Sequence, residues 1–191
     1  MKRLKPYIRY FLMRPENITI DSIPNGTVID IGGGGEGVIA QIGEERITAI
    51  DNKQSEIDEA KAKAPTANWV LGDATDLPYS DQYFDNATAF FSGMYMKIET
   101  FGNMCKEVHR VLKNNGEFWI WDANLPDNED LSIIRLAITL PRGKKIKTGY
   151  GTRIKNRGIK ETKLKLEDAN FSVEIIESNE NWYFLKAIKR M

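Results

Sequence analysis

Three aspartates at nearly regular spacing are the first candidates for chemistry in this sequence. Asp30 precedes a loop with glycines at 32–35 and 37, Asp51 lies 21 residues beyond Asp30, and Asp73 lies 22 residues beyond Asp51. Each follows or ends a short run rich in apolar and β-branched residues, which is typical of a buried strand. Proteins rarely gather like charges unless a ligand brings hydrogen-bond donors to them. The spacing therefore predicts a ligand site where three strands end.

The loop that follows Asp30 has the composition of a loop that binds through its backbone. Glycine lets the chain turn sharply and brings bare N–H groups close to a ligand. A carboxylate at the position of Asp51 can accept hydrogen bonds from both hydroxyls of a ribose, which indicates a nucleoside-containing ligand. Two plainer interpretations stay open: the loop is only a flexible turn, and Asp51 only caps the next helix.

The elements that must position these residues alternate in type along the chain. Strands are predicted at 27–31, 46–50, 68–71, 85–91 and 117–121. Between the last two, apolar residues recur at three- and four-residue steps, which predicts a helix that ends before Gly116. The segments 171–178 and 181–190 read as a closing hairpin. Such a series predicts an α/β fold: a Rossmann-like, doubly wound sheet, mainly parallel with an antiparallel final strand, in three α/β/α layers.

The length and composition narrow the class of protein. A chain of 191 residues fits one domain, expected at 25–191 and preceded at 1–24 by a helical segment or lid. The single cysteine excludes an internal disulfide and a cysteine-rich metal centre, so no metal site is predicted. The sequence has no apolar run long enough to span a membrane, and the basic N-terminus lacks the continuous core of a signal peptide. We therefore expect a cytoplasmic protein without a membrane partner.

The formal net charge of zero conceals a strongly basic segment. Ten Lys and Arg residues but only one acid, Glu161, lie between residues 142 and 165. This block belongs to an insertion predicted at about 125–168, between the fifth strand and the closing hairpin. A docking surface for an anionic substrate or RNA is one interpretation, and a solvated basic face is the other.

Four sequence segments together resemble the class I S-adenosylmethionine-dependent methyltransferases, in particular the type 11 group. They are VIDIGGGGEG, AID, GDATDLPYSDQYFD and KEVHRVLKNNGEFWI, between residues 28 and 120. The resemblance implies that the family's G-x-G-x-G pattern starts at either Gly32 or Gly33. It also implies S-adenosylmethionine as cofactor and the following binding residues: Asp30, Gly32, Gly33 and Gly34 for the methionyl end, Asp51 for the ribose, Asp73 and Ala74 for the adenine, and Ser92 for the ammonium group. Asn52, next to Asp51, is also expected to bind the cofactor.

The resemblance implies in-line methyl transfer to an acceptor, leaving S-adenosylhomocysteine. We expect a small-molecule acceptor, for which an anionic compound is one option, and the oligomeric state stays open. The alternatives are an RNA or protein methyltransferase and a non-catalytic S-adenosylmethionine-binding domain. An NAD-dependent oxidoreductase would share the glycine loop and the ribose carboxylate, but it would not explain GDATDLPYSDQYFD or the antiparallel final strand. Substrate contacts are expected from Met94, Tyr95 and Tyr150.

No catalytic base is identifiable from the sequence. Such a base is optional, because the cofactor itself activates the methyl group. Tyr95, Glu99, Asp122 and Tyr150 are candidates by location alone. His109 and Cys105 lie on a predicted helix, and both are expected to be structural.

Overall fold

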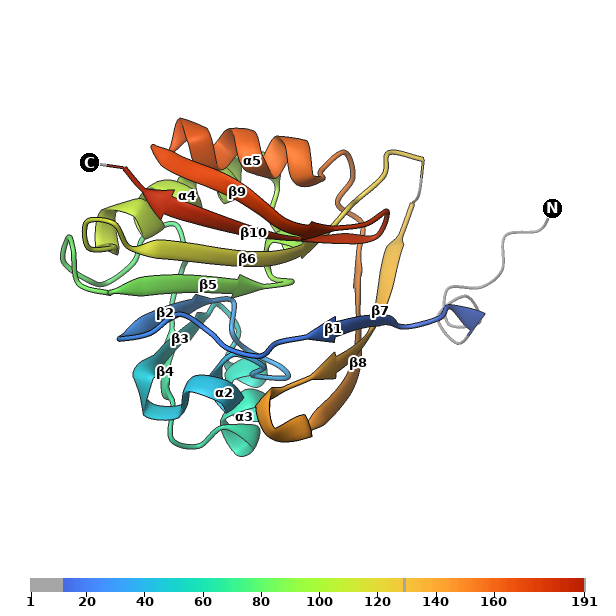
Figure 1. Cartoon of the computed structure of the whole chain (residues 1–191), viewed down its shortest axis with the longest axis horizontal. Coiled ribbons are helices and arrows are strands. Elements are labelled where there is room, and N and C mark those ends of the chain that lie inside the picture. The colour runs from blue at the N-terminus through green and yellow to red at the C-terminus, as the bar shows by residue number, and fades with distance from the viewer. Residues whose placement is uncertain (1–11, 129, 191) are drawn as a thin grey trace.

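The computed structural model describes residues 12–128 and 130–190, and these form two β-sheets with helices packed around them (Figure 1). The larger sheet has seven strands in the order β4-β3-β2-β5-β6-β10-β9, and the smaller has three in the order β1-β7-β8. The strands of the larger sheet are β2 (Val28–Ile31), β3 (Ile47–Asp51), β4 (Asn68–Leu71), β5 (Asn86–Phe90), β6 (Glu117–Ala123), β9 (Phe171–Ser178) and β10 (Trp182–Lys189).

The direction of the strands confirms the predicted fold class. Strands β2 to β6 pair in parallel, whereas β10 is antiparallel to both β6 and β9. The predicted closing hairpin is therefore present. From β2 the chain first adds β3 and β4 on one side and then adds β5 and β6 on the other side. The winding direction therefore reverses at β2. A sheet of this kind binds ligands outside the carboxyl ends of its central strands.

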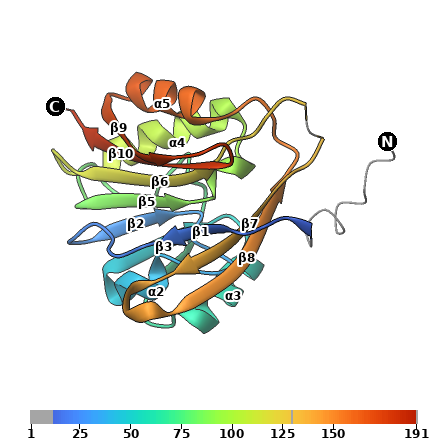
Figure 2. The same cartoon turned by 45° about the vertical axis from the view of Figure 1, so that its right-hand side comes forward.

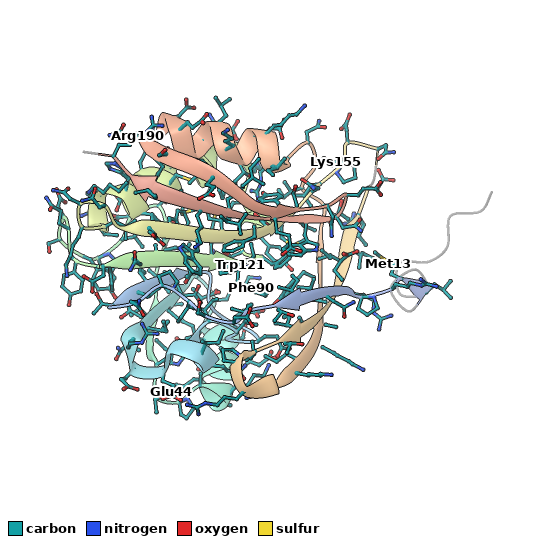
Figure 3. The ribbon with its side chains drawn as sticks, viewed as in Figure 1. Met13, Glu44, Phe90, Trp121, Lys155 and Arg190 are labelled. Carbon is teal, nitrogen blue, oxygen red and sulfur yellow. The ribbon has the colours of Figure 1, made fainter. Side chains whose placement is uncertain are left out.

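Apolar residues on both faces of the sheet explain its layers. In β2, Val28 belongs to one hydrophobic cluster and Ile29 to the other, as the alternation of side chains along a strand requires. Phe90 and Trp121 lie near the middle of the molecule, with their ring centroids 5.9 Å apart (Figure 3).

The helices are α2 (Ala40–Gly43), α3 (Gln54–Lys63), α4 (Ile98–Val111) and α5 (Ile159–Asp168), with 3-10 turns η1 (Glu44–Arg46), η2 (Gly93–Tyr95) and η3 (Pro141–Gly143).

The predicted helix before β6 is α4, and its apolar stripe is fully buried. Phe101, Cys105 and Val108 are inaccessible to solvent within the cluster that also contains Leu166 of α5. Helices α4 and α5 lie side by side over one face of the large sheet (Figures 1 and 2). The helix that was expected to follow Asp51 is α3.

The smaller sheet contains β1 (Glu16–Thr19), β7 (Ser132–Thr139) and β8 (Lys145–Thr152). Strands β7 and β8 form an antiparallel hairpin, and β1 pairs with β7 in parallel. The sheet stands across the carboxyl ends of β5 and β6 (Figure 2). Its inward face contributes Ile18, Leu136 and Ile138 to the core.

This sheet corrects part of the prediction for residues 1–24. Residues 16–19 form a strand and not a helix, because β7 offers them backbone partners and an apolar face for Ile18. The first eleven residues of the predicted helical segment or lid lie outside the described residues. The insertion predicted at about 125–168 contains the β7–β8 hairpin and α5.

Candidate functional site

The glycine loop follows β2 and wraps closely around two carboxylates. The N–H groups of Gly32 and Gly33 donate to the Ile50 carbonyl at 2.8 and 3.3 Å, which ties the loop to the end of β3. A Cβ atom on Gly33 would lie 2.5 Å from Asp30 Oδ2, and one on Gly34 would lie 2.7 Å from Asp51 Oδ2. Larger residues at these positions would therefore displace the carboxylates.

Asp30 is held in the protein interior behind this loop. Its side chain is 1% exposed, and Oδ1 accepts a hydrogen bond from the Thr88 hydroxyl of β5 at 2.8 Å. Burial raises the pKa of Asp30 to about 7, the hydrogen bond from Thr88 opposes this rise, and the negative charge of Asp51 adds to it. Thr88 is a residue that sequence reasoning missed, because a threonine within a strand is ordinary.

Asp51 ends β3 and connects the glycine loop with the start of α3. Oδ2 accepts the N–H of Gly34 at 3.2 Å, and Oδ1 accepts the N–H of Lys53 at 3.0 Å. Helix α3 starts after Lys53, and no side chain caps it. Asp51 is therefore not the helix cap that the sequence left open. Its neighbour Asn52 is exposed.

The third strand end reaches the same edge of the sheet. The N–H of Gly72 donates to the Asp51 carbonyl at 3.0 Å, which places the turn after β4 beside β3. In that turn Asp73 Oδ1 accepts the N–H and the hydroxyl of Thr75, both at 2.8 Å. These hydrogen bonds lower the pKa of the exposed Asp73 carboxyl. Ala74 is half-buried against the adjoining apolar cluster.

The residues after β5 lie where the two sheets meet. The Ser92 hydroxyl donates to the Ile31 carbonyl at 2.6 Å, which joins the ends of β5 and β2. Met94 is fully buried, and its N–H donates to Asp122 Oδ1 at 3.1 Å. Tyr95 is 52% exposed and forms a hydrogen bond with the backbone of Gly151 in β8.

Tyr150 of β8 faces the glycine loop and not the larger cavity described below. Its ring stacks on Phe91 with centroids 5.7 Å apart. Together with Asp30 and Gly32–Gly34 it lines a space of about 10 Å³, which is roughly the room that one water molecule needs. A bulkier group can therefore enter beside the loop only if Tyr150 moves.

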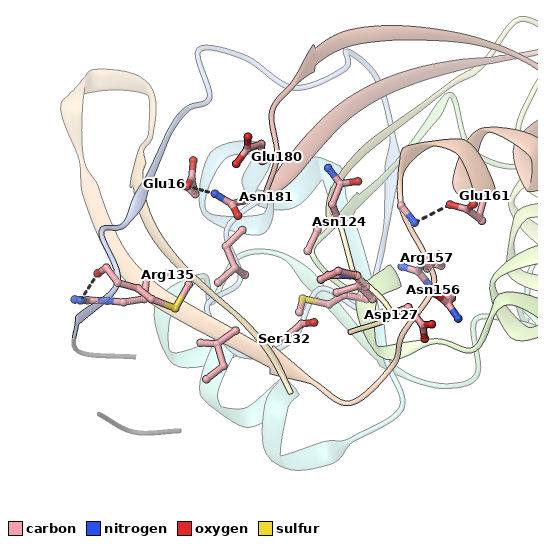
Figure 4. A pocket seen from close by; sticks show the side chains of 18 of the residues that line it. Glu16, Asn124, Asp127, Ser132, Arg135, Asn156, Arg157, Glu161, Glu180 and Asn181 are labelled. Carbon is pink, nitrogen blue, oxygen red and sulfur yellow. Dashed lines mark hydrogen bonds between the residues drawn. The ribbon is translucent and has the colours of Figure 1, made fainter. Parts of the chain in front are cut away.

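A larger cavity of about 750 Å³ opens where β6 ends (Figure 4). Its walls come from β1, the segment after β6, β7, the loop before α5 and the β9–β10 turn. Met94 lies in its wall, whereas Tyr95 and Tyr150 do not. On one side Glu16 accepts the side-chain N–H of Asn181 at 2.7 Å. The volume falls within the range of small-molecule sites.

A buried ion pair supports the floor of this cavity. Arg157 Nη2 lies 2.5 Å from Asp122 Oδ2, and neither side chain is more than 1% exposed. Arg157 also donates to the Met96 carbonyl at 2.9 Å. Asp122, which the sequence offered as a candidate base, is therefore the ion-pair partner of Arg157. Sequence reasoning missed this role, because Arg157 is one of ten basic residues in its segment.

The remaining candidates lie apart from both spaces. Glu99 is exposed on the first turn of α4. His109 packs edge-on against Phe171, and burial lowers its pKa. Cys105 is fully buried, and burial raises the pKa of its thiol, so the thiol is protonated at neutral pH. Among the described residues no cluster of His, Cys, Asp and Glu is placed to hold a metal ion.

The basic block divides between several surfaces. Lys145, Lys147 and Arg153 are exposed on β8 or just after it. On α5, Lys163 and Lys165 lie within 4 Å of acids of the same helix. Arg157 is buried, as described above. The block is therefore not one continuous patch.

The strand order, with a glycine loop and carboxylates at the central strand ends, defines a Rossmann-like fold of the class I methyltransferase type. Residues 29–120 match the model of a family described as "Methyltransferase domain". This match and the curated relatives described next confirm the predicted resemblance to the class I S-adenosylmethionine-dependent methyltransferases.

The chain is similar in sequence to curated methyltransferases over part of their length. It is 31% identical to an uncharacterised methyltransferase of Synechocystis over 123 residues, covering 63% of this chain and 57% of that protein. It is 34% identical to the human mitochondrial 2-methoxy-6-polyprenyl-1,4-benzoquinol methylase over 97 residues, covering 48% and 29%. The chain thus spans about half or less of these relatives.

Solved structures share the fold at low sequence identity. A protein of Pyrococcus horikoshii superposes with a TM-score of 0.66 and 17% identity, covering 97% of this chain and 88% of the other. An S-adenosylmethionine-dependent methyltransferase of Methanosarcina mazei superposes with a TM-score of 0.59 and 19% identity, covering 97% and 98%. No helix in the described ranges is long and apolar enough to cross a membrane.

Proposed function

We propose that this protein binds S-adenosylmethionine and transfers its methyl group to a small-molecule acceptor. The observation that carries the proposal is the hydrogen bond from the Gly34 N–H to Asp51. It brings the glycine loop and the carboxylate suited to a ribose to one edge of the sheet. The chemistry of this edge fits the cofactor, because backbone N–H groups and carboxylates converge there while the glycines leave no side chain in between.

In this proposal each strand end holds one part of the cofactor. Asp30 and Gly32–Gly34 contact the methionyl end after Tyr150 moves aside, and Asp51 and Asn52 contact the ribose. Asp73 and Ala74 contact the adenine. Ser92 fixes the end of β5 through Ile31, so that the backbone there faces the ammonium group.

The bound cofactor supplies a methyl group activated on a positively charged sulfur. Transfer of this methyl group to the acceptor would leave S-adenosylhomocysteine, and the acceptor's proton would pass to solvent. The protein contributes by orienting the acceptor, and good orientation corresponds to effective molarities of about 10⁵–10⁸ M. The cavity of about 750 Å³, with Met94 in its wall, is the proposed acceptor site.

The named relatives support a small-molecule acceptor, since one curated match is a benzoquinol methylase. An anionic acceptor guided by the exposed lysines of β8 stays a prediction. So do the cytoplasmic location, the single domain at 25–191 and the absence of a membrane partner.

Calorimetry with S-adenosylmethionine, S-adenosylhomocysteine and NAD tests the cofactor. We expect the two adenosyl compounds to bind and NAD not to bind. Asp51→Ala should weaken binding at least tenfold without unfolding the protein, whereas the exposed control Asp58→Ala should leave it unchanged. Binding of NAD without S-adenosylmethionine, or equal affinity in Asp51→Ala, would refute the assignment.

A second function, methylation of RNA, is favoured by the exposed Lys145, Lys147 and Arg153. Phosphate contacts by these residues would give an affinity for RNA that falls steeply with salt. A salt titration with a short RNA separates this function from the first. A cofactor-binding domain without catalysis would bind S-adenosylmethionine yet release no S-adenosylhomocysteine with any acceptor.

A further inference from the structure

We infer that Arg157 and Asp122 are positioning residues for methyl transfer, because together they fix the η2 turn, which joins the end of β5 to the large cavity. The inference rests on the proposed function in taking the end of β5 as the place of the cofactor's ammonium group. It goes further by giving a buried ion pair a role in the reaction, exerted through the backbone of this turn.

The η2 turn lies between the glycine loop and the cavity of about 750 Å³. Before its first residue, the Ser92 hydroxyl donates to the Ile31 carbonyl at 2.6 Å. A Cβ atom on Gly32 would collide with that of Ser92, so the turn begins in direct contact with the loop. Two residues later, Met94 lies in the cavity wall. A shift of the turn would therefore move both the backbone that faces the ammonium group and the wall of the acceptor site.

The hydrogen bonds within the turn set its shape but not its position. The Tyr95 N–H donates to the Ser92 carbonyl at 3.2 Å, and the Met96 N–H donates to the Gly93 carbonyl at 2.8 Å. Ser92 ties the start of the turn to β2. The rest of the turn needs ties to other elements if its position is to be fixed.

Asp122 and Arg157 supply these ties from two sides. Asp122 Oδ1 accepts the N–H of Met94 at 3.1 Å, and Arg157 Nη1 donates to the Met96 carbonyl at 2.9 Å. The two side chains lie 2.5 Å apart, and neither is more than 1% exposed. A guanidinium presents its donors in a rigid fork, so Arg157 holds a carboxylate and a carbonyl in fixed relative positions. The turn is thereby held between β6 and the loop before α5 (Figure 4).

The packing at Gly93 shows how closely the ion pair fits the turn. A Cβ atom on Gly93 would collide with Asp122 Oδ2 and would lie 2.9 Å from Arg157 Nη2. On its other side the guanidinium lies 4.8 Å from the ring centroid of Phe101. Apolar residues of similar volume often stabilise a protein as well as a buried ion pair does. What they cannot replace is the hydrogen bonds to Met94 and Met96, and these bonds assign the pair its positioning role.

Two adenosyl compounds separate this role from a general effect on the fold. S-adenosylhomocysteine and 5′-methylthioadenosine share the adenine, the ribose and the sulfur, but only the first carries the amino-acid end. Their dissociation constants are measured by titration calorimetry for the wild type and for the double variant Asp122→Val/Arg157→Met. The variant removes both buried charges together, so the fold is retained, which urea unfolding checks.

We expect the double variant to bind S-adenosylhomocysteine about two- to tenfold more weakly than the wild type, the effect of one hydrogen bond. The affinity for 5′-methylthioadenosine should stay the same, because this compound does not reach the end of β5. Loss of both affinities to the same degree, or loss of neither, would overturn the inference.

Arg157→Lys makes the same test if the double variant does not fold. Lysine keeps a positive charge beside Asp122, but its compact ammonium lacks the fork that also reaches the Met96 carbonyl. It should weaken S-adenosylhomocysteine alone, and an unchanged ratio of the two affinities would again count against the role. The control Lys155→Met removes an exposed ion pair from the same loop and should change neither affinity.

Arg110 provides a contrast on the adenine side of the sheet. It donates to the carbonyls of Tyr79 and Leu77 at 2.7 and 3.0 Å, in the segment that follows Asp73. Arg110→Lys should weaken both compounds to the same degree, because both contain the adenine. The Arg157 variants should differ from it by sparing 5′-methylthioadenosine.

Failure of the proposed function gives a different result. If neither S-adenosylmethionine nor S-adenosylhomocysteine binds the wild type, the proposed function fails, and the role in methyl transfer fails with it. If both bind the wild type and S-adenosylhomocysteine binds the variants equally well, this inference fails alone.

Discussion

Replacement of Asp30 by Asn should stabilise the protein at neutral and alkaline pH, although it should weaken cofactor binding. In the folded protein the pKa of Asp30 is raised from 3.8 to about 7, chiefly by burial. The unfolded chain therefore loses this proton near pH 4, whereas the folded protein keeps it until about pH 7. Because the folded state binds more protons in this window, its stability falls as the pH rises from 4 to 7 and is constant above it.

The size of the effect follows from the two pKa values. One pKa unit corresponds to about 1.4 kcal/mol, so the difference between 3.8 and about 7 amounts to about 4 kcal/mol as an upper bound. Asn has the shape of Asp and can still accept the hydrogen bond of Thr88, but it needs no charge in the interior. We expect the free energy of unfolding of Asp30→Asn to exceed that of the wild type by about 2 to 4 kcal/mol at pH 8 and to be nearly the same at pH 4.

Urea unfolding followed by tryptophan fluorescence between pH 4 and 8 measures this difference. The difference between variant and wild type isolates Asp30, because other groups such as His109 titrate in both proteins. Asp58→Asn, on the exposed face of α3, serves as the control and should change stability little at any pH. A variant that is no more stable than the wild type at pH 8, or a difference that does not grow between pH 4 and 7, would refute the reasoning.

Three further predictions concern the same structure. Asp51→Asn should lower the pKa of Asp30, since the charge of Asp51 contributes to its rise; carboxyl ¹³C NMR measures this, and an unchanged pKa contradicts the coupling. Arg157→Ala should cost about 3–5 kcal/mol in urea unfolding by leaving Asp122 buried without its partner. The matched Lys155→Ala removes an exposed pair with Asp130 and should cost less than about 1 kcal/mol, so equal losses would argue against a special role for Arg157. Cys105 should react with a thiol reagent only at the rate of unfolding, and fast labelling in the native state would show that its burial is incomplete.

Local patterns in the sequence predicted the parts of the site that lie on consecutive βα units. Asp30 with its glycine loop, Asp51 and Asp73 each lie in or just after the last residues of a recognisable strand, and parallel pairing brings successive strand ends to one edge. The position of Asp51 was predictable for this reason, but its bond to the Gly34 N–H was not. That bond depends on the path of the loop, which follows from close packing against Asp30 and Ala49.

The smaller sheet shows where local patterns stop being informative. Strand β1 pairs with β7, which lies more than a hundred residues later in the chain, and four residues are too few to show a clear alternation. Their short, mixed sequence gave no sign of a strand. In the same sheet, the pairing of β8 with β7 places Tyr150 at the glycine loop and not in the wall of the larger cavity.

The sequence by itself determined the family resemblance, the seven-stranded sheet and the carboxylates at its central strand ends, because these depend on short-range periodicity and on motifs read directly from the chain. The tertiary structure alone decided which of ten basic residues is buried, where Tyr150 lies and which side chains line the cavity. Burial and charge pairing arise between segments distant in sequence: Arg157 differs from its neighbours because its guanidinium lies 2.5 Å from Asp122 of β6 and donates to the Met96 carbonyl.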